Sequence, residues 1–159
     1  MQSLSRSAAR YVSKLSNKIR RHTNAFSLNG KLSGAQGRIL HFILAQTDDI
    51  FQKDIEEEYS LRPSSATEIL KKMEQNGLIH REPTSYDGRL KKIIPSEKAI
   101  HYQKQVITDL TKLEHDLTKG IDPEQLEIFF QVMEKMLKNL SFFNPHTSLL
   151  DTLDGRSSL

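Results

Sequence analysis

Hydrophobic side chains recur at helical spacing over the first part of the chain. Between Leu4 and Ile19 they alternate with a basic face, which predicts an amphipathic helix. The next segment, HTNAFSLNGK, is interpreted as a break. Ser33 and Gln36 then form a capping-box pattern before a dense apolar run. The run predicts a second helix that is largely buried.

Two shorter helices are predicted next. The third begins near Asp49, with Gln52 three residues later at the matching capping position. The fourth extends from Pro63 to Asn76, because proline is favoured at a first helical position and Gly77 suits a left-handed cap. Its apolar residues fall within an arc of about 100° and its polar residues lie opposite. The apolar set is Ala66, Ile69, Leu70 and Met73.

The pattern after Gly77 changes to that of two strands. LIHRE and RLKKII have the length and composition of a β-hairpin joined by PTSYDG, in which Pro83 stops the first strand and Asp87-Gly88 turns the chain. A long helix follows from Ser96, and Gly120 with Pro123 separates it from a sixth helix that ends near Leu140. Residues 141–159 have no clear period and stay unassigned.

Composition narrows the class of protein. The chain has 159 residues, which fits a single domain spanning 1–159. It contains no cysteine, so a disulfide framework, a thiolate zinc site and a thiol redox switch are excluded. No apolar run approaches the roughly 18 residues of a membrane span, and the first residues lack the core of a signal peptide. We therefore expect a cytoplasmic protein with no membrane partner.

The charges are segregated along the chain. Residues 1–47 hold eight basic and no acidic side chains, and residues 48–61 hold one basic and six acidic. Residues 62–92 hold seven basic and four acidic. Such segregation is typical of a polyanion-binding surface, although solvated helix faces are the commoner meaning of a charge run.

Two short helices, a polar-faced helix and a basic hairpin together indicate a winged helix-turn-helix, in which the second helix of the motif enters the major groove. The fold class is therefore mainly α with a small β-hairpin wing. Hydroxyls near the start of the fourth helix are suited to phosphates or base edges, its lysines to phosphates or guanine, and its carboxylate to a cytosine amine. The candidate DNA-binding residues are Arg62, Ser64, Ser65, Thr67, Glu68, Lys71, Lys72, Arg81, Asp87, Arg89 and Lys91.

The tip of the hairpin is the second candidate contact. Arg89 is suited to insertion into a narrow minor groove, with Asp87 two residues earlier to orient its guanidinium. Arg81, Lys91 and Lys92 are expected along the arms, against the DNA backbone. The alternative is an ordinary surface hairpin.

The stretches LSGAQGRIL, SSATEILKKMEQNGLIHREP and DGRLKKIIPSEKA resemble the multiple antibiotic resistance regulator (MarR) family of bacterial transcription factors. The resemblance runs from about Leu4 to Leu140, and its most specific part is NGLIHRE followed by Asp87-x-Arg89. Arg62 stands where the family often has a capping serine, and Ala99 where it usually has glycine. Arg62 is therefore a candidate for a phosphate contact in place of a cap.

The resemblance implies a homodimer built from about 1–30 and 98–140, with a DNA-binding lobe at about 33–95. The N- and C-terminal apolar faces support this, because they exceed what one small domain buries on itself. The family default is a repressor of a pseudo-palindromic operator that is released by a small-molecule effector, and no cofactor is expected. The effector-binding residues are left unassigned, although Phe26, Arg38, His41 and Phe42 lie in suitable segments.

Three alternatives remain. A zinc-responsive regulator of the same fold would need carboxylates and scattered imidazoles as ligands, such as Glu97, His101, His22, His41 and His115. A protein-interaction module that has lost DNA binding is the second. An enzyme is disfavoured because nucleophile, phosphate-loop and dinucleotide motifs are missing from the sequence.

Overall fold

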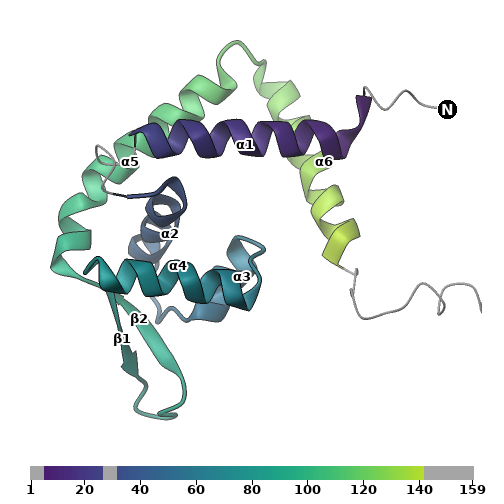
Figure 1. Cartoon of the computed structure of the whole chain (residues 1–159). Helices are drawn as coiled ribbons and strands as arrows, with labels where there is room; N and C mark the ends of the chain where they lie inside the picture. Colours follow the sequence, from purple (N-terminus) through teal and green to yellow (C-terminus); the bar gives the residue numbers. More distant parts are fainter. Residues whose placement is uncertain (1–5, 27–31, 142–159) are drawn as a thin grey trace, which may run out of the picture. The chain divides into compact units, whose positions relative to one another are not determined.

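The computed structural model describes residues 6–26 and 32–141 of the chain (Figure 1). Backbone proximity divides the chain into two compact units, Met1–Leu117 and Thr118–Leu159, which are described separately. No helix in the described part is long and apolar enough to cross a membrane. The elements are α1 (Ala8–Phe26), α2 (Gly34–Ala45), α3 (Gln52–Glu58), α4 (Pro63–Gln75), β1 (Ile79–Pro83), β2 (Lys91–Pro95), α5 (Glu97–Thr118) and α6 (Pro123–Ser141). The mainly helical fold with a two-stranded wing is confirmed.

The hydrophobic core lies where α2, α3, α4 and the hairpin meet. Each of these elements contributes its apolar positions, as the helical and strand periods predict. The largest fully buried side chains are Ile39, Leu40, Ile55, Leu70, Met73 and Leu78. The core therefore fixes α4 from one side and leaves its other side in solvent.

The capping box of α2 is confirmed. Ser33 Oγ accepts a hydrogen bond from the Gln36 N–H at 3.2 Å, and Gln36 Oε1 accepts one from the Ser33 N–H at 3.1 Å. Gly34, the next residue, lies against the last turn of α1, which leaves no room for a side chain at this position. A Cβ at Gly34 would overlap Thr23. The Gly34 N–H also donates to Asn24 Oδ1 at 2.9 Å.

The predicted break after Ile19 is wrong over residues 22–26, which continue α1 as far as Phe26. No glycine or proline occurs before Gly30, so nothing in the backbone stops the helix earlier. The Thr23 hydroxyl turns inward and donates to the Ile19 carbonyl at 3.0 Å. Leu4 and residues 27–31 of the predicted elements, and the tail from residue 142 onward, lie outside the described residues.

The third helix begins three residues later than the predicted start near Asp49. The helix begins at Gln52, and the Asp54 carboxylate accepts a hydrogen bond from the Phe51 N–H at 2.8 Å. Asp49 instead forms an ion pair with Lys92 at 3.5 Å. An isolated bridge between Ile50 and Ile93 keeps the chain before α3 extended, which prevents a helical start there.

The hairpin is confirmed, with a shorter second strand than predicted. Arg81 pairs with Ile93 and Pro83 with Lys91 in an antiparallel register. β2 begins at Lys91, so Arg89 belongs to the connecting loop. In Figure 1 the hairpin projects away from the helices of its unit.

The long fifth and the sixth helices are confirmed. Ser96 caps α5 by accepting a hydrogen bond from the Ala99 N–H at 3.2 Å. Ala99 and Val106 are the buried residues of α5, and they join the core of the lobe. Gly120 adopts a positive φ of 77°, which ends the helix before Pro123 begins α6. No described side chain of α6 is buried.

Candidate nucleic-acid interface

Helix α4 has one buried and one exposed face. Ala66, Leu70 and Met73 anchor it in the core. The predicted candidates occupy the opposite face, where all of the following are exposed: Ser64, Ser65, Thr67, Glu68, Lys71 and Lys72. The structure therefore brings these six residues together on one surface, as the sequence predicts.

The first turn of α4 has no side-chain cap. Arg62 stands at the N-cap position with φ −70° and ψ 148°, and Pro63 takes the first helical position. The first backbone bond of the helix joins the Ala66 N–H to the Arg62 carbonyl, so the Ser64 and Ser65 N–H groups point out of the helix start. Exposed N–H groups at such a start favour an anion.

Thr67 differs from its neighbours because its hydroxyl holds α4 to α3. It donates to the Pro63 carbonyl at 2.8 Å and accepts from the Gln52 amide at 2.9 Å. The same amide donates to the Glu56 carboxylate at 3.0 Å. The structure thus gives Thr67 a positioning contact in addition to its exposure. Gln52, which the sequence suggested only as a capping residue, fixes the angle between the two helices.

Glu68 and Lys72 form an ion pair on the exposed face, with 2.9 Å between Oε1 and Nζ. The hydrogen bond from Lys72 and its positive charge lower the pKa of the Glu68 carboxyl. Lys72 thereby offsets the repulsion that a phosphate would exert on Glu68. Lys71, one position away, has no carboxylate partner among the described residues, so its charge is available to an anion.

The start of α5 supports the end of α4. The Ser96 hydroxyl donates to the Gly77 carbonyl at 2.6 Å, and Lys98 Nζ donates to the Asn76 carbonyl at 2.8 Å. A cation near the final carbonyls of a helix also complements its dipole. Sequence reasoning missed both contacts, because the paired residues are about twenty positions apart and no local pattern links them.

The connecting loop of the wing presents Arg89 to solvent. The Asp87 carboxylate accepts a hydrogen bond from the backbone N–H of Arg89 at 2.9 Å. The prediction that Asp87 orients the guanidinium is therefore corrected: the bond is to the backbone, since an aspartate two residues before an N–H closes a local turn. Asp87 orders the loop that carries Arg89.

The arms of the wing hold their basic residues differently. Arg81 is half-buried, and its Nε lies 3.7 Å from Glu74 Oε2 on α4. Lys92 pairs with Asp49, while Lys91 is exposed. Lys91 is therefore the arm residue most open to a phosphate, and Arg81 braces β1 against α4.

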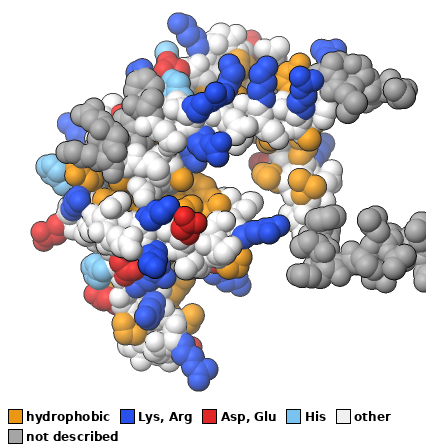
Figure 2. All heavy atoms as spheres, viewed as in Figure 1, with side chains coloured by type: hydrophobic (Ala, Val, Ile, Leu, Met, Phe, Trp, Pro, Cys, Tyr) orange, Lys and Arg blue, Asp and Glu red, His pale blue; other side chains and the backbone are white. Residues whose placement is uncertain are grey.

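Figure 2 shows basic side chains over α4 and the hairpin, with acidic ones among them, and a further row of basic side chains along α1. The six acidic residues of 48–61 lie before and on α3. The lobe is therefore mixed in sign, and the cations concentrate on α4 and the wing.

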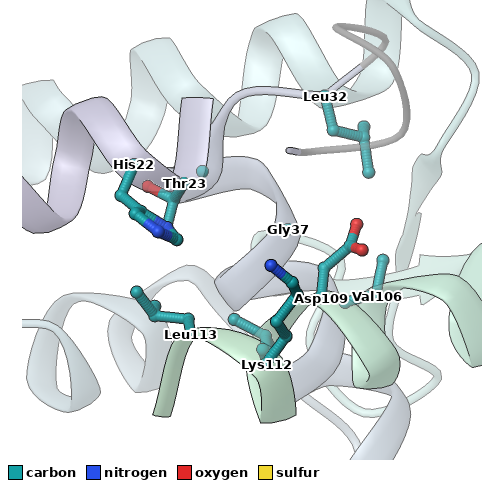
Figure 3. Close-up of a pocket in the computed structure, with 10 residues that line it drawn as sticks. His22, Thr23, Leu32, Gly37, Val106, Asp109, Lys112 and Leu113 are labelled. Atoms are coloured by element: carbon teal, nitrogen blue, oxygen red, sulfur yellow. The ribbon is translucent and has the colours of Figure 1, made fainter. Parts of the chain in front are cut away.

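A small pocket lies between α1, the start of α2 and α5. His22, Asp109 and Lys112 extend into the space between the two long helices (Figure 3). The space available to the centre of a water-sized sphere is only about 20 Å³. That is room for roughly one water molecule. The remaining lining residues are Thr23, Leu32, Gly34, Gly37, Val106, Leu110 and Leu113.

The zinc alternative has no preassembled ligand set in the described part of the chain. Within residues 6–26 and 32–141, no group of three or more His, Asp or Glu side chains lies within reach of one metal ion. His22 and His115 both lie near Asp116, at 3.9 Å and 3.4 Å, but as ion-pair partners of a single carboxylate.

Comparison with known families finds one match, which lies in the lobe. The sequence model described as MarR family matches residues 31–90. Residues 31–90 therefore resemble the MarR family, whose model covers this part of the chain. The match covers α2, α3, α4, β1 and the wing loop, which are the elements that form the exposed α4 face and present Arg89. No curated protein matches the chain.

Solved MarR-type structures share the fold well beyond the matched segment. The transcription regulator MarR from Oenococcus oeni PSU-1 is 22% identical, with a TM-score of 0.73 over 83% of this chain and 99% of that one. The S. aureus MepR–DNA complex is 20% identical, with a TM-score of 0.78 over 85% and 99%. A putative MarR family regulator from Listeria monocytogenes, complexed with 26mer DNA, is 18% identical, with a TM-score of 0.76 over 85% and 89%. At these identities the likeness establishes the fold.

Proposed function

We propose that this protein is a transcriptional regulator that binds a specific site in double-stranded DNA. The observation that carries the proposal is the outer face of α4. That face is anchored on the core by Ala66, Leu70 and Met73, and it presents hydroxyl, carboxylate and ammonium groups beside a projecting basic wing. A helix of this kind fits a major groove about 12 Å wide.

The two parts of the surface have different tasks. On α4, Ser64 and Ser65 meet the phosphates at the uncapped helix start, Lys71 neutralises a further phosphate, and the Glu68–Lys72 pair faces the base edges. On the wing, Arg89 enters the adjacent minor groove, where the potential is most negative. Arg62 and Lys91 complete the backbone contacts.

The working form in this proposal is a homodimer. α6 exposes a run of large apolar side chains, and α1 exposes Tyr11 as well. The exposed set on α6 is Ile128, Phe129, Phe130, Val132, Leu137 and Leu140. A second copy would cover these faces and place two recognition helices about 34 Å apart, one turn of DNA, so the operator is a pseudo-palindrome.

Repression with effector release completes the proposal. The space beside His22, Asp109 and Lys112 is the candidate effector site, and it is too small at present for more than about one water molecule. An effector that enters must separate α1 from α5. Because α5 begins on the lobe at Ser96, that separation changes the spacing of the lobes. The effector releases DNA only as far as it prefers the separated state.

The test is recovery of a DNA site. The full chain is incubated with sheared DNA from its source organism, and the retained fragments are sequenced at several salt concentrations. The wild-type protein is compared with Arg89→Ala and with the control Lys104→Ala, which removes an exposed lysine of α5. We expect a pseudo-palindromic site and an affinity that falls steeply with salt. In Arg89→Ala alone, the slope of log K against log salt should be smaller by about 1.8, which is about 0.9 for each of the two copies.

Two results would contradict the proposal. One is retention of no fragment above background at low salt, which would favour a protein-interaction module. The other is identical binding by the wild-type and Arg89→Ala proteins at every salt concentration, which would remove the wing from the interface. A chelator that abolished binding would instead point to the metal-responsive alternative.

A further inference from the structure

The wing loop exposes two large apolar side chains beside its arginine. Tyr86 is 71% exposed and Leu90 is 44% exposed. Single exposed apolar residues are common on protein surfaces. Here, however, an aromatic and an aliphatic side chain flank Arg89 on one loop that projects away from the helices (Figure 1).

This loop is held in one shape by its own hydrogen bonds. Thr84 is buried, and its hydroxyl donates to the Asp87 carbonyl at 2.7 Å and accepts from the Asp87 N–H at 3.1 Å. The Thr84 N–H donates to the Leu90 carbonyl at 2.9 Å, and the Leu90 N–H donates to the Asp87 carbonyl at 3.1 Å. With the bond from Arg89 to Asp87, these contacts close the loop at both ends.

The order of the wing loop also determines the backbone positions of Tyr86 and Arg89. Tyr86 lies between the two residues that bond each other, Thr84 and Asp87, so its backbone is placed by the same contacts that place Arg89. An aromatic ring has only two side-chain torsions to restrict, so little entropy is lost when it meets a partner surface. The backbone on either side of Tyr86 is therefore ordered, and its exposed ring is open to a contact with a partner surface.

We propose that Tyr86 is a further DNA-contacting residue, whose ring packs against the deoxyribose wall of the minor groove that Arg89 enters. The inference rests on the proposed function. The minor groove is about 6 Å wide and three residues span at most about 10 Å, so Tyr86 is within reach of the sugar-phosphate edge of the groove that Arg89 enters. The faces of deoxyribose are apolar and suit an aromatic ring. Proteins that bind the minor groove frequently combine basic side chains with apolar ones.

The salt dependence of DNA affinity distinguishes the contact of the neutral Tyr86 ring from that of the charged Arg89 side chain. A neutral ring displaces no counterion, so its loss lowers affinity equally at all salt concentrations. Loss of Arg89 from both copies of the proposed dimer reduces the salt slope by about 1.8. One series of affinity measurements at different salt concentrations therefore distinguishes the contribution of Tyr86 from that of Arg89.

The experiment measures affinity for a fragment that the wild-type protein retains, over a salt series, for Tyr86→Ala, Tyr86→Phe and the control Ser85→Ala. We expect Tyr86→Ala to bind roughly tenfold more weakly, the effect of truncating a moderately important interface residue, with an unchanged slope. Tyr86→Phe and Ser85→Ala should bind as the wild type does. Hydroxyl-radical cleavage, which attacks deoxyribose, should show that Tyr86→Ala alone loses protection at the wing positions. Unfolding of Tyr86→Ala is measured in parallel, and its midpoint should match that of the wild type because the side chain is exposed.

The proposal is overturned if Tyr86→Ala binds within twofold of the wild type, or if Tyr86→Phe is as weak as Tyr86→Ala, which would assign the contact to the hydroxyl. If the wild-type protein retains no specific DNA fragment, the result contradicts the proposed function and therefore also this inference. The two failures are therefore distinct.

Discussion

The winged lobe and α6 show opposite relations between apolar residues and burial. In the lobe, α2, α3, α4 and the hairpin bury their apolar faces on one another, and Leu40, Ile55 and Leu70 are fully buried. Within its own unit, α6 has strong helical periodicity yet no buried residue among those described. The lobe thus completes its core within one chain, with Ala99 and Val106 of α5, whereas the apolar face of α6 stays exposed. In our proposal a second copy covers it.

The largest expected effect comes from a charge placed on the exposed apolar face of α6. Leu137→Glu should prevent association of two chains, and affinity for a two-half-site operator should fall by about a hundredfold or more, because the second half-site is no longer tethered. The control Asn139→Glu adds the same charge at a polar position of α6. Sedimentation gives the mass and fluorescence anisotropy the affinity. A Leu137→Glu protein with unchanged mass would remove α6 from the interface.

A cavity in the core of the lobe tests whether this core is formed within a single chain. Leu70→Ala should lower the free energy of unfolding by about 2–5 kcal/mol, because it empties a fully buried site. The loss should not depend on protein concentration, since the core lies within one chain. Lys71→Ala, at the exposed neighbouring position, should stay within about 0.5 kcal/mol of the wild type. Urea unfolding at two protein concentrations measures both. A strongly concentration-dependent loss for Leu70→Ala would show that the lobe core is not self-contained.

Removal of the Ser96 hydroxyl should have an intermediate effect. Ser96→Ala eliminates the cap of α5 and the hydrogen bond to the Gly77 carbonyl. We expect a loss of about 0.5–2 kcal/mol in unfolding free energy. Because the same hydroxyl joins α5 to the end of α4, DNA affinity should also fall. Ser85→Ala is the matched control, and equal stability of the two variants would refute the assigned role.

The smallest expected effect concerns pH. Lys72 lowers the pKa of Glu68, so the pair stabilises the fold while the carboxylate is ionised. Its contribution is present above the pKa of Glu68 in the unfolded chain and is lost as pH falls through the lower pKa of the folded state. Lys72→Met should raise the pKa of Glu68, which NMR titration of its side-chain carboxyl measures. An unchanged pKa would show that the ion pair does not persist in solution.

Much of the lobe follows from local sequence patterns. The α2 capping box, the amphipathic α4 with Pro63 at its start and Gly77 at its end, and the hairpin are all encoded within a few residues, so periodicity and capping rules predict them. The grouping of Ser64, Thr67 and Lys71 on one face follows from the helical period alone.

The errors and omissions come from contacts between distant segments. Asp49 looked like a helix cap because its pairing with Lys92 on β2 is invisible in the local sequence. The position of Gly34 against Thr23, and the contact of Lys98 with the end of α4, likewise depend on the folded arrangement. A two-residue spacing fits both the guanidinium and the backbone N–H of Arg89, so the sequence alone does not determine which of the two bonds to Asp87.

The central claim is that two copies of this chain, each with a self-contained lobe, bind one DNA site. The most direct test is the stoichiometry of the specific complex, measured by sedimentation of the wild-type protein with a retained fragment. The account predicts two chains per duplex, with contacts in two half-sites about one DNA turn apart and much weaker binding when one half-site is scrambled. A complex of one chain per duplex, with undiminished affinity for a single half-site, would contradict it.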